Sequence, residues 1–252
     1  MLAARVIPCL LLKDQGLVKT VRFNKPIYVG DPINAVRIFN EKEVDELIFL
    51  DITATTENRK PNFQLISDIA SESFMPFSYG GGIRDFEDVE KLFTLGVEKI
   101  VLNSVVNIRP EFIRTVSSLY GSQSVVVSMD VKKNIFGQYE RYFHGGRKKT
   151  KGNIVDLARE AEQLGAGEIF LNSIDRDGTR LGFELDVIAR VSHAVSIPLV
   201  ACGGAGCNED FVAAVRAGAS GVAAGSMFVF HGKHNAVLIT YPSKEELDNI
   251  QL

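Results

Sequence analysis

The chain has little cysteine, and none of it is arranged for cross-linking. Its 252 residues contain three cysteines, Cys9, Cys202 and Cys207, without a CxxC spacing. Neither a disulfide framework nor a CxxC zinc site is therefore expected. We interpret the three as buried or partly buried free thiols of a protein from a reducing compartment.

Histidine is also scarce. The four histidines fit no metal-ligand or catalytic-triad spacing, and we expect them at the surface: His144, His193, His231 and His234. The sequence thus predicts neither a metal site nor a bound cofactor.

Long apolar runs and an excess of positive charge are missing as well. No stretch of about 20 apolar residues occurs, so no membrane span is expected. The net charge of -3 gives no general attraction to nucleic acid or anionic lipid. The start, MLAARVIPCLLLKD, favours a strand over a signal peptide, because an aspartate comes early and no small-residue cleavage site follows. We therefore expect a cytoplasmic protein.

What the sequence does contain is a long internal repeat. Residues 80–104 and 202–226 align without a gap at an offset of 122, and the glycine turns of the two segments coincide in this alignment. Residues 46–53 and 168–175 align at the same offset. Solenoid units are far shorter, and 252 residues suit one (β/α)₈ barrel. The pattern predicts a single α/β domain over residues 1–252, a TIM barrel of two duplicated half-barrels, about 1–121 and 122–252.

Apolar runs and glycine stops define the expected elements. The eight strands are predicted at 5–11, 46–52, 76–79, 99–103, 124–130, 168–173, 197–202 and 221–225. A helix is expected after each of the first seven strands, among them 85–95, 153–164, 184–195 and one after Glu209, whereas the signal for an eighth helix is weak. Residues 12–30 are interpreted as a long loop. Alternating aromatics around Phe136-Gly137 predict a hairpin. The tail is less regular and ends in a short helix at 243–250.

In such barrels the active site lies at the carboxyl ends of the strands. Glycines there let backbone N–H groups approach an anion, and the following helix adds its positive N-terminus. We predict two phosphate sites, one formed by Gly81, Gly82, Asn103 and Ser104, the other by Asp177, Gly178, Gly203, Gly204, Gly225 and Ser226. The alternative is that these glycines only form tight turns between strands and helices.

Carboxylates at strand ends are candidates for proton transfer. Asp130 ends an otherwise uncharged strand, SVVVSMD, and is the candidate general acid or base, unless it caps the next loop. Asp51 and Asp177 are candidates for orienting substrate or for capping loops, and Lys19 is a further candidate for orienting substrate.

Four charged residues stand at the opposite, amino-terminal ends of strands: Arg5, Glu46, Lys99 and Glu168. Their charges sum to zero, so they can form a ring of ion pairs across the barrel bottom. Taken alone, this favours a stabilising plug.

Five motifs together resemble one family. DELIFLDITA, GGGIRDFE, GSQSVVVSMD, GAGEIFLNSIDRDGT and CGGAGCNEDF are similar to the cyclase subunits (HisF) of imidazole glycerol phosphate synthase, a lyase of histidine biosynthesis. The resemblance implies a duplicated (β/α)₈ barrel and a substrate with a phosphate at each end. It also implies a glutaminase subunit (HisH-like) docked on the barrel bottom, with ammonia passing a charged gate at Arg5, Glu46, Lys99 and Glu168.

One departure bears on the chemistry. The family has two catalytic aspartates, of which the second matches Asp130. At the first, the family reads ACLDVKDG where this chain reads PCLLLKDQG, so Leu11 replaces a proton-transfer group. The tail after residue 230 departs as well, where the family has a final amphipathic helix.

Three interpretations remain open. The departures resemble a branch of cyclase-like paralogues whose ammonia is supplied to an N-acetyl sugar amidotransferase of surface-polysaccharide biosynthesis, and we favour this. The second is a histidine-pathway cyclase in which another group replaces the aspartate. The third is a phosphate-binding regulatory or scaffold barrel. Whether the chain is itself a competent enzyme stays open with them.

Overall fold

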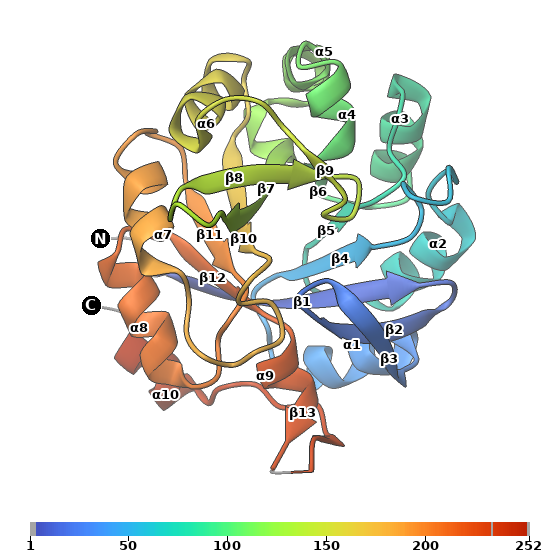
Figure 1. The fold of residues 1–252 in the computed structure, drawn as a ribbon. Coiled ribbons are helices and arrows are strands. Elements are labelled where there is room, and N and C mark those ends of the chain that lie inside the picture. Colours follow the sequence, from blue (N-terminus) through green and yellow to red (C-terminus); the bar gives the residue numbers. More distant parts are fainter. Residues whose placement is uncertain (1–3, 233, 251–252) are drawn as a thin grey trace.

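A computed structural model describes residues 4–232 and 234–250, and its centre is a closed barrel of eight parallel strands (Figure 1). These are β1 (Arg5–Lys13), β4 (Leu47–Asp51), β5 (Phe77–Gly80), β6 (Lys99–Leu102), β7 (Val125–Lys133), β10 (Glu168–Ser173), β11 (Leu199–Cys202) and β12 (Gly221–Ala224). The ring closes because β1 pairs with both β12 and β4, and β10 pairs with both β7 and β11. The predicted (β/α)₈ barrel is confirmed.

Helices surround the barrel and cover the outer faces of its strands (Figure 1). They are α1 (Pro32–Glu41), α2 (Phe63–Glu72), α3 (Phe86–Thr94), α4 (Ser104–Ile108), α5 (Phe112–Tyr120), α6 (Ile154–Gln163), α7 (Leu185–Ser192) and α8 (Asn208–Arg216). Asp31 caps α1 by accepting the N–H of Asn34, and Pro32 opens the helix, because its fixed φ suits the first helical position. The eighth position has only a short helix, α9 (Ser226–Val229).

The loop predicted at residues 12–30 is wrong. The segment is a hairpin of β2 (Gly16–Val21) and β3 (Asn24–Gly30), and β2 also pairs antiparallel with the end of β1. Its turn residues Arg22 and Phe23 have φ of 52° and 60° without any glycine. Such a turn gives no glycine signal in the sequence.

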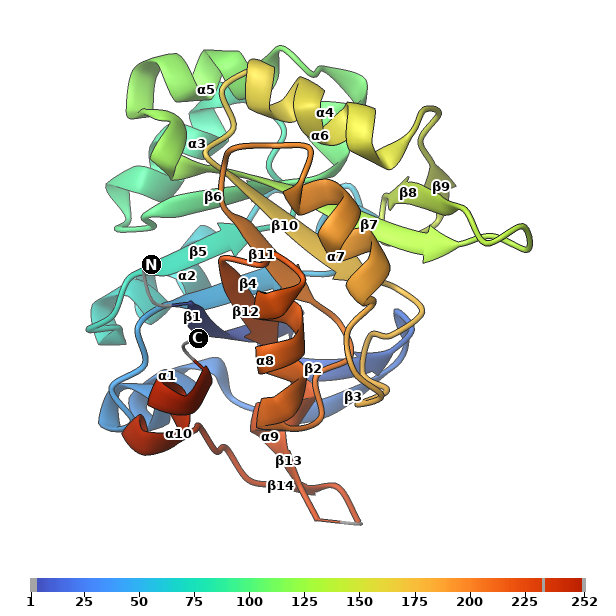
Figure 2. The same cartoon turned by 90° about the vertical axis from the view of Figure 1, so that its left-hand side faces the viewer.

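The hairpin predicted around Phe136 is confirmed. Strand β8 (Tyr139–Phe143) pairs antiparallel with β7 and continues to β9 (Lys148–Lys149). Both hairpins extend from the carboxyl ends of barrel strands, on the right of the molecule in Figure 2. The two hairpins therefore flank the same end of the barrel, at the carboxyl ends of its strands.

Several predicted boundaries shift. β1 and β7 run to Lys13 and Lys133, because each continues into its hairpin partner. Helix α8 begins at Asn208, before Glu209, because its N-cap is Cys207. The tail forms a small hairpin, β13 (Phe230–His231) with β14 (Ala236–Val237), followed by α10 (Lys244–Ile250).

Two apolar cores hold the barrel. The larger fills the space between strands and helices and includes Phe39, Phe49 and Phe211. The smaller lies inside the barrel and contains Ile7, Cys9, Ile48, Val101, Val126, Phe170, Val200, Cys202 and Ala223. The barrel interior is therefore packed over its middle.

The glycine turns pack in the same way in both halves. A Cβ on Gly81 would collide with the carbonyl oxygen of Asp51, and one on Gly203 with that of Ser173, which is 122 positions from Asp51. Gly82 and Gly204 similarly abut the Cβ atoms of Ala54 and Arg176, again 122 apart. Each glycine turn thus rests on the loop of the preceding barrel strand.

The cysteines and histidines only partly follow expectation. Cys9 and Cys202 are buried free thiols, but Cys207 is exposed, because it stands outside the core at the start of α8. His193 is exposed at the end of α7. His231 and His234 are also exposed. Within residues 4–232 and 234–250, no helix combines the length and apolar character that spanning a membrane requires.

Candidate active site

A cavity of about 990 Å³ opens at the carboxyl ends of the barrel strands. Eight lysines and arginines line it: Lys13, Lys19, Arg22, Arg84, Arg109, Lys132, Arg147 and Lys148. Four carboxylates do so too: Asp51, Glu57, Asp130 and Asp177. The excess of cationic side chains favours an anionic ligand.

Asp130, on β7, is buried at the bottom of this cavity. Burial raises the pKa of its carboxyl to about 7, against the opposing effects of the Arg141 cation and of hydrogen bonds from Asn103 and Asn172. The amide Nδ2 of Asn103 donates to Asp130 Oδ2 at 2.7 Å. A carboxyl that titrates near neutrality can both accept and give a proton.

Leu11 lies on the cavity wall at the end of β1, half-buried. It is level with Leu50 on β4, and both side chains pack on the inner core. The wall is therefore apolar at this point, where the resemblance calls for a second carboxylate.

Lys19 does not lie in a loop; it is a buried residue of β2. Its Nζ donates to the carbonyl oxygen of Cys9 at 2.6 Å and leaves no room for a Cβ on Gly225. Burial lowers the pKa of the Lys19 ammonium. The predicted role in orienting substrate stays a prediction, although the side chain does line the cavity.

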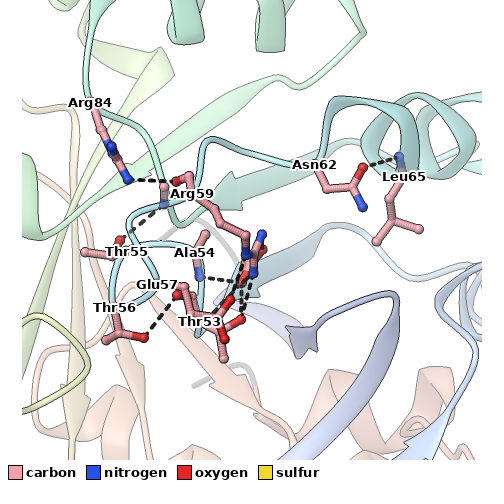
Figure 3. Close-up of polar contacts among 11 residues, drawn as sticks. Thr53, Ala54, Thr55, Thr56, Glu57, Arg59, Asn62, Leu65 and Arg84 are labelled. Carbon is pink, nitrogen blue, oxygen red and sulfur yellow. Dashed lines mark hydrogen bonds and ion pairs between the residues drawn. The ribbon is translucent and has the colours of Figure 1, made fainter.

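Asp51 holds the loop that follows β4. Its Oδ1 accepts the backbone N–H groups of Thr53 and Ala54 at 3.0 and 2.9 Å. Arg59 pairs with the carboxylate at 3.5 Å, and its carbonyl oxygen accepts from Arg84 (Figure 3). These contacts favour the loop-capping alternative for Asp51.

Asp177 is likewise engaged within the fold. Its Oδ2 accepts from the hydroxyl of Thr20 at 2.8 Å and the N–H of Phe23 at 3.2 Å, which fixes the turn of the β2–β3 hairpin. Its own N–H donates to the carbonyl oxygen of Ser173. These contacts favour a loop-capping role for Asp177, and its place among the predicted phosphate ligands stays a prediction.

The structure brings the remaining predicted phosphate ligands to the cavity in two groups, one at the turns after β5 and β6 and one at those after β10, β11 and β12. Two atoms in the first group already have protein partners. The N–H of Gly82 donates to the hydroxyl of Thr55 at 3.2 Å, and the hydroxyl of Ser104 accepts the N–H of His144 at 3.0 Å.

The turns after β6 and β12 match each other closely. Asn103 and Gly225, which precede α4 and α9, have φ/ψ of −126°/−74° and −117°/−66°. The helices that follow are short, and both begin at the cavity. Equivalent turns thus present equivalent backbone at two places on the rim.

The four predicted ring residues meet at the opposite end of the barrel. Arg5 Nη1 lies 2.6 Å from Glu46, and its Nη2 pairs with Glu168. Lys99 bridges the same two carboxylates at 2.9 and 3.3 Å. The ion pairing is confirmed, whereas a gating role stays a prediction.

Three residues of the site were missed from the sequence. His144 was expected at the surface but lines the cavity, because the β8–β9 connection folds over it. Asn172 faces the cavity beside Asp130. Arg141, buried on β8, donates to the carbonyl oxygen of Ser128 at 3.3 Å. Asn172 could have been found, since it has the same strand parity as Glu168, which was predicted to face the barrel axis.

Within the described residues, no group of three or more histidine, cysteine, aspartate or glutamate side chains is placed to hold a metal ion. The cavity is thus built from backbone turns, cationic side chains and four carboxylates, among them the buried carboxyl of Asp130 with its raised pKa.

Comparison with known proteins agrees with this geometry. Residues 5–235 match the family model described as "Histidine biosynthesis protein". The "Putative imidazole glycerol phosphate synthase subunit hisF2" of Pseudomonas aeruginosa is 52% identical over 249 residues, covering 98% of this chain and 99% of that protein. A protein of Leptospira borgpetersenii with a corresponding HisF name is 49% identical over 245 residues, 96% of each chain.

A relative named "Imidazole glycerol phosphate synthase subunit HisF", from Thermobifida fusca, is 43% identical over 234 residues, 91% of each chain. Since the family model and these relatives cover nearly the whole barrel, the chain belongs to the histidine biosynthesis protein family, among its HisF-type barrels.

Proposed function

We propose that this chain is the barrel subunit of a cytoplasmic glutamine amidotransferase of the imidazole glycerol phosphate synthase type. It receives ammonia at the charged ring and delivers it to a phosphorylated ligand in the cavity. The observation that carries this is the pairing of two sites on one barrel axis. Arg5, Glu46, Lys99 and Glu168 lie at one end, and buried Asp130 lies in a cationic cavity at the other.

The names of the relatives favour the histidine-type reaction, cyclisation to imidazole glycerol phosphate, over sugar amidation. In that reaction Asp130 serves as the proton-transfer group. Its pKa near 7 suits both directions of transfer. The two groups of glycine turns hold the terminal phosphates of the ligand, with backbone N–H groups as donors.

The partner that supplies ammonia is a glutaminase docked on the ring face. Two large apolar side chains are exposed on segments that lead into the amino-terminal ends of strands there. Phe74 precedes β5 and is 89% exposed, and Leu119, near the end of α5, is 64% exposed. Exposed aromatic residues are common anchors of protein interfaces.

A second function is favoured by one observation, the apolar wall at Leu11 and Leu50. With a single carboxyl near the reacting atoms, the chain would pass ammonia on rather than complete the cyclisation. The acceptor would then be an N-acetyl sugar bound to a separate amidotransferase of surface-polysaccharide biosynthesis.

The deciding experiment measures turnover of the histidine-pathway substrate by the purified chain with ammonium chloride as nitrogen source. Free ammonia removes the partner from the question. Turnover that disappears in Asp130→Asn supports the histidine-type reaction. Undetectable turnover, with a glutaminase still stimulated by the chain, supports the second function.

Docking is tested separately by glutaminase stimulation. Phe74→Ser should weaken it, and Phe136→Ser is the matched control. Phe136 is equally apolar and 80% exposed, but it lies on the hairpin at the opposite end of the barrel. Equal loss in both variants, or loss in neither, would exclude docking through Phe74.

A further inference from the structure

Two buried oxygens at the bottom of the cavity have no hydrogen-bond partner among the described residues: Asn103 Oδ1 and Asn172 Oδ1. Asn172 is only 7% exposed, and both side chains line the cavity. A buried acceptor without a donor destabilises the fold, so such oxygens indicate a missing donor.

The orientation of these amides is fixed by Asp130. Asn103 donates its Nδ2 to the carboxylate at 2.7 Å, and Asn172 lies level with Asp130 in the β7–β10 register, where its amide lowers the pKa of that carboxyl. An ionised carboxylate only accepts, so each amide turns its nitrogen toward Asp130 and leaves its oxygen for another donor.

Both asparagines lie above the charged ring on their own strands. Lys99, Val101 and Asn103 follow one another along β6 at the spacing of one face, ending just past the strand, and Glu168, Phe170 and Asn172 do so along β10. Strand β7, with Asp130, lies between them. The three adjacent strands thus lead from the ring to the unpartnered oxygens.

The buried cations Lys19 and Arg141 do not satisfy these oxygens, although the Nε of Arg141 is itself without a partner among the described residues. The ammonium of Lys19 donates instead to the carbonyl oxygen of Cys9. What fits beside the asparagines is a small group with several N–H donors that arrives along the barrel axis.

We propose that Asn103 and Asn172 form, with Asp130, a receiving site that binds ammonia or ammonium as it leaves the barrel interior. The inference rests on the proposed ammonia delivery. The two amide oxygens and the carboxylate accept the N–H donors of the incoming nitrogen. This holds it beside Asp130 until it meets the acceptor substrate.

The test is an NMR titration of the full ¹⁵N-labelled chain with ammonium chloride, against sodium chloride at equal ionic strength. At pH 8 the Asp130 carboxyl, with its pKa of about 7, is mostly ionised. The side-chain amide signals of Asn103 and Asn172 should shift in a saturable way. The amide of Asn208, on α8 outside the barrel, is the internal control and should not shift.

Asn172→Leu, of similar shape but without the acceptor, should weaken ammonium binding about tenfold, as expected for one lost hydrogen bond. Asn172→Asp keeps an acceptor and adds charge, and it should bind at least as tightly as the wild type. It also keeps the test decisive if the leucine variant does not fold. A shift that never saturates, or an unchanged midpoint in Asn172→Leu, would overturn the inference.

Failure of this inference differs from failure of the proposed function. Ammonia-dependent turnover without saturable ammonium binding would remove the receiving site and leave the function intact. Saturable binding in a chain that forms no product and stimulates no glutaminase would support the receiving site and remove the proposed function.

Discussion

Strands β1 and β7 open the two halves of the barrel, and each continues into a hairpin that walls the cavity. At their carboxyl ends the halves differ: β1 carries Leu11 and β7 carries Asp130, 119 positions later. Leu11 faces the apolar Leu50, whereas Asp130 is surrounded by two asparagine amides and the nearby Arg141 cation. Equivalent backbone thus supports an inert wall on one side and a titrating carboxyl on the other.

The largest effect should come from making the two strand ends alike. Leu11→Asp restores a second proton-transfer group, and such groups typically contribute 10²–10⁴-fold. We expect cyclase turnover with free ammonia to rise by about that factor, measured as kcat in a steady-state assay. Leu11→Asn is the control, because asparagine has the shape of aspartate but cannot ionise. An equal gain in both variants would mean that polarity alone matters.

The Asp130 side can be examined without any substrate. Because burial raises the folded-state pKa to about 7, the stabilisation associated with protonated Asp130 is present below pH 4 and is lost as the pH rises through 7. The shift corresponds to about 4 kcal/mol at 1.36 kcal/mol per unit. Asp130→Asn does not show this pH-dependent loss of stability, because asparagine does not titrate.

Between pH 4 and pH 8, the unfolding free energy of Asp130→Asn relative to the wild type should therefore rise by up to about 4 kcal/mol. Urea unfolding at both pH values measures it. Asp14→Asn, an exposed carboxylate just beyond β1, should show no such change. A flat difference for Asp130→Asn would mean that folding does not shift the pKa of this carboxyl.

The charged ring lies on the axis that both halves share. Lys99→Glu places three carboxylates against Arg5 alone, which should cost about 1–3 kcal/mol of stability, because the hydrogen bonds from Lys99 to Glu46 and Glu168 are lost. With a glutaminase bound, we also expect more glutamine hydrolysed per product formed. Lys42→Glu, exposed at the same end, is the control. Unchanged coupling would exclude a gate at Lys99.

The smallest effect compares equivalent glycines. Gly96 and Gly218 end α3 and α8 regions with φ of 98° and 106°, so alanine strains both by about 1 kcal/mol. A Cβ at position 96 meets only Ala70 at 3.7 Å, but one at 218 would also collide with Ser192. Thermal unfolding should therefore show a larger loss for Gly218→Ala, partly restored by Ser192→Ala. Equal losses would mean that strain alone decides.

Much of the frame was accessible from the sequence, for reasons visible in particular residues. Buried parallel strands appear as apolar runs, and Gly96 or Gly218 marks the end of a helix by its positive φ. The β2–β3 hairpin was missed because β3 is mostly exposed and lacks an apolar alternation, and because its turn at Arg22 and Phe23 has no glycine.

The site was accessible only in part. Position at a strand end is enough to suggest Asp130, but what a side chain does there depends on partners far away in sequence. Asp177 is engaged by Thr20 and Phe23, more than 150 residues earlier. Asn172 can be recognised as a site residue only when it is known that β6 and β10 both pair with β7, which carries Asp130.

The seating of each glycine turn on the preceding loop has a consequence for how this protein can change. Gly81 and Gly203 bear on main-chain oxygens, so the seating of these two turns does not depend on which side chain stands at position 11. This part of the scaffold and the proton-transfer chemistry are therefore encoded at separate positions. A lineage could exchange an aspartate for Leu11, and so redirect the reaction, while its architecture was inherited unaltered.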